Sequence, residues 1–194
     1  MTSSASTNAT PNHSPQAAEP TSLLRTLMRR WPTLLAVVSA FLIADAGTER
    51  LRSLLILLVL AYLVITVIGV RSATWPLLLG LTILLVALSL QDQVRMDAAL
   101  VVAAAVTLVV GIVRRSPRRE LAIQTGSVVV LVALSLAAAS AEPPTATYLV
   151  AGGWLAHGIW DFVHIWRDKV VARSYAEWCG VLDVLVAGAL IATV

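Results

Sequence analysis

Three side chains that can bind protons or metal ions share one face of a predicted helix near the end of the chain. His157, Asp161 and His164 fall within a stripe about 60° wide when each residue turns the helix by about 100°. A further carboxylate, Asp183, follows in the next apolar segment. Ionisable groups at bilayer depth are costly and usually face the interior of a helix bundle, so these four residues are the candidate catalytic residues.

The spacing of these residues suggests a metal site. Asp161 and His164 form an Asp-x-x-His pair, which can supply two ligands because residues i and i+3 share a helix face. Asp183 approaches from the antiparallel neighbouring helix, so the predicted ligands of a divalent transition metal are Asp161, His164 and Asp183. His157 is the weakest ligand candidate, because seven residues, about 10.5 Å of helix rise, separate it from His164.

Close packing of the last two helices would bring these side chains together. Small residues on both sides make such packing feasible, and they include Gly152 and Gly153 on one helix and Gly180 and Gly188 on the other. The one cysteine, Cys179, is expected to act as a small buried hydrophobe rather than as a ligand or nucleophile.

The same residues leave four functions open. The His and Asp groups fit interhelical hydrogen bonds that only hold the bundle together, and they also fit a metal-dependent intramembrane enzyme acting on a lipid. A small proton-coupled transporter or relay would use His for its near-neutral pKa and Asp as counter-charge. In the fourth function, Arg167, Lys169 and Arg173 bind a lipid headgroup at the cytoplasmic rim. An enzyme or small transporter acting on a lipid or small molecule is the leading class.

Composition requires a bilayer around these elements. Of the 194 residues, 58% are hydrophobic and only 13% are charged, and the mean hydropathy is +0.85. A soluble domain of this size could not bury so much apolar surface. The net charge of +3 comes from arginines that flank apolar blocks, so it indicates membrane topology rather than nucleic-acid binding. The expected partners are membrane lipid and a lipid or small-molecule substrate, and the expected location is the cell membrane.

The predicted fold is an all-α polytopic transmembrane bundle of about seven spans. The apolar blocks cover residues 31–46, 51–70, 73–90, 97–113, 121–141, 145–166 and 178–194. With seven spans, eleven of the fourteen lysines and arginines fall on one side: Arg25, Arg29, Arg30, Arg71, Arg114, Arg115, Arg118, Arg119, Arg167, Lys169 and Arg173. The positive-inside rule then places the N-terminus in the cytoplasm and the C-terminus outside.

The beginning of the chain allows two interpretations. Residues 1–30 are polar and lack periodicity for most of their length, so we expect a disordered cytoplasmic tail before a single transmembrane domain at residues 31–194. Residues 31–46 are expected to be a retained helix. They also fit a secretory signal with an A-x-A cleavage site at Ala44-Asp45-Ala46, which would leave six spans.

Seven spans with intramembrane His and Asp resemble the ceramidase and adiponectin-receptor type of membrane hydrolase. That resemblance implies metal-dependent hydrolysis of a lipid. Members of that class carry a His-x-x-x-His pair in the last helix and Ser, Asp and His on earlier ones. The last predicted span here has no histidine, and the second to fifth spans carry no histidine. The sequence therefore departs from the family pattern at its ligands, and membership is not claimed.

Overall fold

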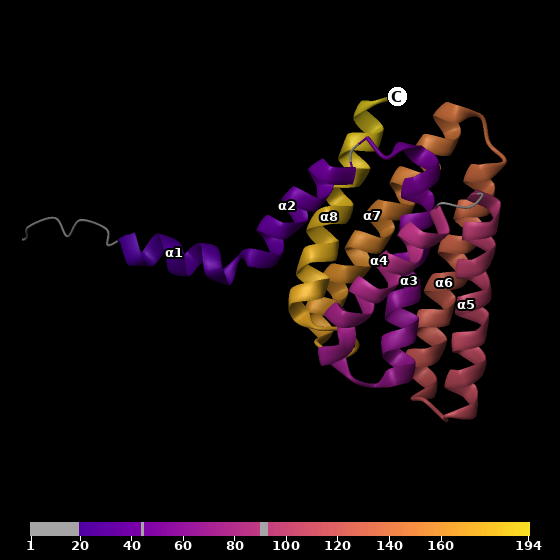
Figure 1. Cartoon of the computed structure of the whole chain (residues 1–194), viewed down its shortest axis with the longest axis horizontal. Helices are drawn as coiled ribbons and strands as arrows, with labels where there is room; N and C mark the ends of the chain where they lie inside the picture. Colours follow the sequence, from indigo (N-terminus) through magenta and orange to yellow (C-terminus); the bar gives the residue numbers. More distant parts are fainter. Residues whose placement is uncertain (1–19, 44, 90–92) are drawn as a thin grey trace, which may run out of the picture. The chain divides into compact units, whose positions relative to one another are not determined.

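The structure is a computed structural model that describes residues 20–43, 45–89 and 93–194. Every regular element in these ranges is a helix (Figure 1). The chain divides into two units, residues 1–31 and 32–194. In the first unit, α1 covers Pro20–Arg29, a segment that the sequence places in the disordered tail. Its leucines recur at three- and four-residue spacing, which favours an amphipathic helix. The rest of the predicted tail, residues 1–19, lies outside the described residues.

Seven α-helices and one 3₁₀ turn follow, and they confirm the predicted all-helical class. Their bounds are α2 Trp31–Ile43, α3 Gly47–Ile68, η1 Arg71–Ala73, α4 Thr74–Ser89, α5 Gln93–Val113, α6 Arg118–Ala139, α7 Pro143–Arg167 and α8 Arg173–Ala192. Successive helices of the second unit run in opposite directions, so the α3–α4, α5–α6 and α7–α8 links gather at one end of the bundle (Figure 1).

Helix α3 is the core of the bundle. Its sequence from Leu54 to Ile68 is apolar on all faces apart from Tyr62 and Thr66, and such a helix is stable only when other helices surround it. The structure buries α3 almost end to end, against α4, α5, α6 and α7. It ends at Gly69, whose φ of 74° is the left-handed conformation that glycine adopts without strain.

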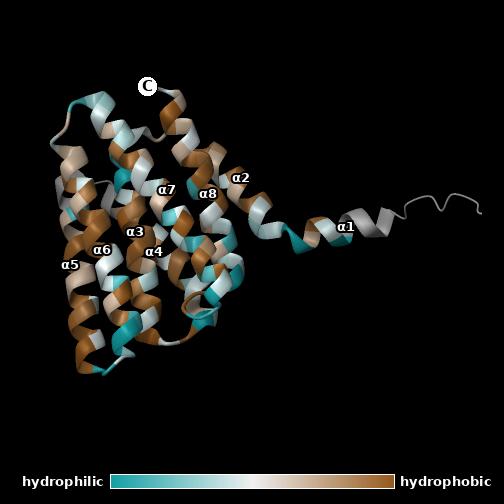
Figure 2. Cartoon of the chain, turned by 180° about the vertical axis from the view of Figure 1, so that it is seen from behind, coloured by the Kyte–Doolittle hydropathy of each residue, from teal (hydrophilic) through white to brown (hydrophobic). Residues whose placement is uncertain are grey.

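Helices α5 and α6 form an apolar outer wall. Hydrophobic residues run along both helices, while hydrophilic residues concentrate at the ends of the bundle (Figure 2). Val130 and Leu136, for example, are each 65% exposed. Four helical segments among the described residues are long and apolar enough to cross a membrane: Gly47–Ile68, Met96–Val113, Arg118–Ala139 and Arg173–Ala192. Apolar surface of this extent supports the predicted transmembrane protein, although α2, α4 and α7 are not among the four.

The largest difference from the predicted boundaries is at the last helix. The sequence places the start of this span at Trp178, whereas α8 begins at Arg173. The charged Glu177 does not interrupt the helix, because its carboxylate accepts a 2.6 Å hydrogen bond from Thr33 on α2. Because α8 starts five residues earlier than predicted, every later side chain of α8 lies about 7.5 Å further from the α7–α8 link than the sequence predicts.

Helix α2 packs on the same part of α8. Ala36 is fully buried, and the indole of Trp178 donates a 3.2 Å hydrogen bond to Ser39. With the Thr33–Glu177 bond, these contacts make α2 part of the helical bundle. Ala44, the first residue of the A-x-A motif, lies outside the part of the chain that the structure describes.

Candidate functional site

Two glycines bring α7 and α8 together at the polar stripe. A Cβ atom on Gly158 would lie 3.0 Å from the Cβ of Asp183, and one on Gly180 would lie 3.3 Å from the Cβ of Asp161. Only glycine therefore fits at these two crossing points without displacement of the neighbouring helix. Gly152 and Gly188, which the sequence also assigns to this packing, face open space. Gly158 is a close-packing residue that the sequence analysis missed.

The crossing places one imidazole beside two carboxylates. His157 Nδ1 lies 2.6 Å from Asp183 Oδ2 and 3.2 Å from Asp161 Oδ2. All three side chains are buried, with at most 1% exposed. One oxygen or nitrogen from each residue lies within 4.8 Å of the others, a spacing that can hold a metal ion. We call these three residues the His/Asp cluster.

The His/Asp cluster differs from the predicted ligand set in its histidine. His157 lies ten residues before Arg167 at the end of α7, and Asp183 lies ten residues after the start of α8. Both are therefore about 15 Å from the α7–α8 link. The sequence starts the last span five residues later, which predicts Asp183 nearer the link, at about the depth of Asp161 and grouped with His164. With the observed helix start, His157 is the histidine beside the two aspartates.

His164 makes hydrogen bonds with other groups. Its Nδ1 lies 3.0 Å from the carbonyl oxygen of Trp160, and its Nε2 lies 3.1 Å from the side-chain nitrogen of Gln124 on α6. Because a carbonyl oxygen only accepts, Nδ1 carries the proton and Nε2 accepts from the Gln124 amide. Both ring nitrogens of His164 are thus engaged within the bundle.

A tyrosine of the central helix connects the two histidines. The Tyr62 hydroxyl donates a hydrogen bond to Asp161 Oδ1. Its ring lies edge-on to His157 at a centroid distance of 5.6 Å and is tilted against His164 at 4.7 Å. Tyr62 is not among the site residues predicted from the sequence. Its position within a long aliphatic run does indicate a polar partner, because a buried phenol usually requires a hydrogen-bond partner.

The cluster has an unbalanced charge and free coordinating atoms. With the imidazole protonated and both carboxylates ionised, its net charge would be −1 in a buried site, which is unfavourable. Asp161 Oδ2 and Asp183 Oδ1 are buried and form no hydrogen bond with the described residues, and Asp161 Oδ2 has only the 3.2 Å contact with His157 Nδ1. A divalent cation beside a neutral imidazole and two carboxylates would bring the net charge to zero.

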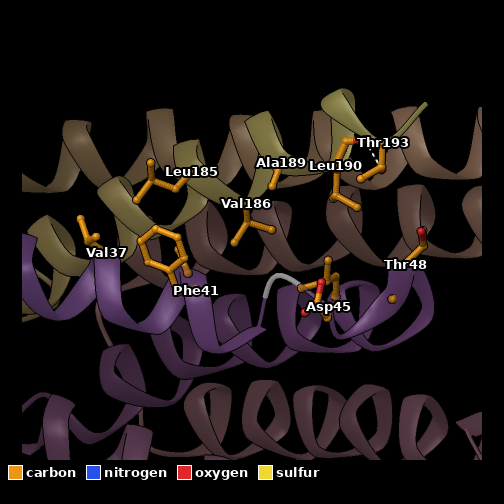
Figure 3. Close-up of a pocket in the computed structure, with 12 residues that line it drawn as sticks. Val37, Phe41, Asp45, Thr48, Leu185, Val186, Ala189, Leu190 and Thr193 are labelled. Atoms are coloured by element: carbon orange, nitrogen blue, oxygen red, sulfur yellow. Dashed lines mark hydrogen bonds between the residues drawn. The ribbon is translucent and has the colours of Figure 1, made fainter.

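A groove between α6 and α7 leads to His157. It has a volume of about 320 Å³ and is lined by Gly126, Ser127, Val130, Leu131, Ala156, His157 and Trp160. A larger cavity of about 510 Å³ lies between α2, α3 and α8, where Val37 and Phe41 face Leu185 and Val186 (Figure 3). That cavity contains none of the four predicted catalytic residues, so the smaller groove is the one connected with the cluster.

Comparison of the chain with protein-family models, curated proteins and solved structures finds no match.

A second buried polar group lies at the opposite end of α3. Arg52 donates to Asp97 on α5 at 2.7 Å and to Glu49 at 3.2 Å, and Ser53 also donates to Asp97. In the charge count from the sequence, Arg52 is one of the three basic residues assigned to the outer side of the membrane. The structure buries it, with 8% of the side chain exposed, in an interhelical ion pair.

The predicted headgroup residues surround the α7–α8 link. Arg167 donates to Glu120 on α6 at 2.8 Å, while Lys169 and Arg173 are exposed. In the same region Arg71 forms an ion pair with Asp168 and donates to the Val171 carbonyl at 3.1 Å.

Cys179 is fully buried beside Tyr175 and is not part of the His/Asp cluster.

Proposed function

We propose that the chain is a multi-pass membrane protein with seven spans, its N-terminus in the cytoplasm and its C-terminus outside. The support is the alternation of helix direction together with the charge distribution. The α3–α4, α5–α6 and α7–α8 links carry Arg71, Arg114, Arg115, Lys169 and their basic neighbours. Under the positive-inside rule, this end of the bundle faces the cytoplasm. Reporter fusions after Arg119 and after Val194 should read opposite sides, and the same side for both would contradict seven spans.

Within this bundle, the His/Asp cluster is proposed to bind a divalent transition metal ion. The observation that carries the proposal is the set of three buried ligand atoms within 4.8 Å of one another, supplied by His157, Asp161 and Asp183. Imidazole nitrogen and carboxylate oxygen are ligands that zinc and neighbouring metals accept. Tyr62 fixes the orientation of one ligand through its hydrogen bond to Asp161, as outer-shell partners of metal ligands do.

The reaction class that best fits this site is metal-assisted catalysis on a lipid. A metal ion held by these three residues would supply Lewis-acid chemistry, which polarises a carbonyl or activates water. The groove connects the His157 side chain with the apolar outer surface of α6 and α7. The exposed Lys169 and Arg173, with Arg167 paired to Glu120, provide positive charge that fits an anionic lipid headgroup at the cytoplasmic rim.

A proton relay is the second candidate, and the arrangement along α7 favours it. His157, Asp161 and His164 follow one another at one-turn intervals, and the Tyr62 hydroxyl and ring bridge them. Such a chain of titratable groups leads from the middle of the bundle towards the α7–α8 link. A relay needs no metal, so metal binding separates the two functions.

Metal-dependent thermal stability tests the proposal. After chelation, Zn²⁺, Co²⁺ or Mn²⁺ added at about 100 times its dissociation constant should stabilise the purified protein by about 2.7 kcal/mol. The Asp161→Asn and Asp183→Asn variants should fold but lose this response. The double variant should lose little more, because ligands of one site act as a unit.

The control is Glu142→Asn, which changes an exposed carboxylate at the other end of α7. This variant should respond as the wild type does. A wild-type protein that no metal stabilises, but whose activity depends on both carboxylates, would favour the relay. If both Asn variants kept full activity, the only remaining role of the His/Asp cluster would be interhelical hydrogen bonding.

A further inference from the structure

The groove between α6 and α7 contains polar atoms that lack partners although apolar residues surround them. His157 Nε2 and Trp160 Nε1 are both buried, and neither forms a hydrogen bond with the described residues. Both residues line the groove. An unpaired buried polar atom is unfavourable, so a ligand that satisfies both atoms would be bound favourably.

The mouth of the groove faces the surface where lipid would lie. Gly126 and Ala156 at its edges are exposed, and Val130 beside them is 65% exposed. Small side chains make the opening: a Cβ atom on Gly126 would meet nothing within 4 Å. The opening therefore lies on the apolar wall of the bundle rather than at its charged ends.

The two polar atoms define the chemistry of the ligand. Trp160 Nε1 can only donate, so it requires an oxygen acceptor. His157 Nε2 accepts a hydrogen bond when Nδ1 donates to Asp183, and it donates when Nδ1 is deprotonated. A hydroxyl satisfies His157 in either form, and an ester or ketone carbonyl satisfies the Trp160 indole. The remaining wall is mostly apolar and suits a hydrocarbon chain, since the hydroxyl of its one polar residue, Ser127, already donates to the Ile123 carbonyl.

We infer that the groove between α6 and α7 admits a membrane lipid laterally from the bilayer and binds its hydroxyl or carbonyl group at His157 and Trp160. This inference rests on the proposed function, because it supplies the substrate entrance of the same site. Trp160 and His157 lie seven and ten residues from the end of α7 at Arg167, or about 10 and 15 Å along the helix. The bound polar group would thus lie below the headgroup level. This depth favours a weakly polar lipid such as a diacylglycerol, which has one free hydroxyl and two ester carbonyls.

Photolabelling in proteoliposomes tests the inference. The full-length protein is reconstituted with a small fraction of diacylglycerol that carries a diazirine in one acyl chain, and the labelled peptides are mapped by mass spectrometry. We expect labelling of α6 and α7 at the groove that unlabelled diacylglycerol displaces. Gly126→Leu should fill the mouth and reduce this labelling about tenfold. Trp160→Phe removes the indole N–H together with the pyrrole ring, and loss of the hydrogen bond alone should reduce labelling about three- to tenfold.

The matched control is Gly188→Leu on α8, because a Cβ atom there also meets nothing within 4 Å. This variant should label as the wild type does. Groove labelling that excess lipid does not displace, or that is unchanged in Gly126→Leu, would overturn the inference. Metal binding is measured on the same samples. Displaceable labelling without metal would refute the metal site alone, and metal without displaceable labelling would refute the lipid entrance alone.

Discussion

His157 and Asp183 lie at the same depth on two antiparallel helices, with 2.6 Å between imidazole Nδ1 and carboxylate Oδ2. The match follows from helix geometry, because each residue is ten positions from its end of the α7–α8 link. Gly158 and Gly180 then allow the helices to approach closely enough for contact. Asp161, one turn from His157 on α7, adds the second carboxylate.

Removal of the Tyr62 hydroxyl should weaken the cluster without changing its packing. In Tyr62→Phe the ring remains, but Asp161 loses a donor in a buried site. We expect the free energy of unfolding to fall by about 1–3 kcal/mol, measured by denaturant unfolding in detergent micelles. Tyr148→Phe is the control, because that side chain is 54% exposed and the change should be within about 0.5 kcal/mol. Equal effects of the two substitutions would contradict a role for Tyr62 at the cluster.

A leucine at Gly180 should separate α7 from α8. Even a Cβ atom there would lie 3.2 Å from the Phe162 ring, so Gly180→Leu should destabilise the protein by about 1–3 kcal/mol or more. It should also weaken metal binding, because His157 and Asp183 would move apart. Gly188→Leu, which enters open space, should leave both the melting temperature and metal affinity near wild type. A tolerated leucine at Gly180 would refute the close crossing.

The Arg52–Asp97 pair should show strong coupling. Arg52→Met removes the guanidinium that lies 2.7 Å from the Asp97 carboxylate and should cost roughly 2–4 kcal/mol, somewhat below a fully buried pair because Asp97 is 22% exposed. Asp97→Leu should cost a similar amount, and the double variant should recover much of the loss. Double-mutant cycles from unfolding in detergent measure this coupling. Additive costs would show that the pair does not stabilise the bundle.

The ion pair of Arg71 with Asp168 should produce a pH dependence of stability. The hydrogen bond from Arg71 lowers the pKa of Asp168 below its ordinary value of 3.8. A lowered folded-state pKa stabilises the protein above the unfolded-state value, and this contribution disappears as the pH falls through the folded value. The Asp168→Asn variant should not strain the backbone. The φ of residue 168 is 45°, and asparagine tolerates this left-handed conformation.

The difference in melting temperature between wild type and Asp168→Asn should therefore be constant above about pH 5 and shrink below pH 3.8. Since the pair is exposed, the difference should also shrink in high salt. A difference that grows as the pH falls would contradict the ion pair.

The sequence predicts the helices better than the site. Continuous apolar runs determine where helices lie, so each of the seven predicted blocks corresponds to a helix. Helix ends are less certain, since Arg173 and Glu177 resemble link residues in the sequence although the helix includes both. That five-residue difference is enough to exchange His164 for His157 beside Asp183. To predict the interhelical contacts of Tyr62 and Arg52, one must know which helices face each other. Hydrophobic periodicity cannot provide this for a helix that is apolar on all sides.

Metal content of two histidine variants tests the central claim most directly. Wild-type protein loaded with Zn²⁺ and freed of excess metal should contain one equivalent by elemental analysis. His164→Gln should retain it, because His164 is bonded to Gln124 and Trp160, whereas His157→Gln should lose it. Absence of metal from the wild type, or loss in His164→Gln with retention in His157→Gln, would contradict the account.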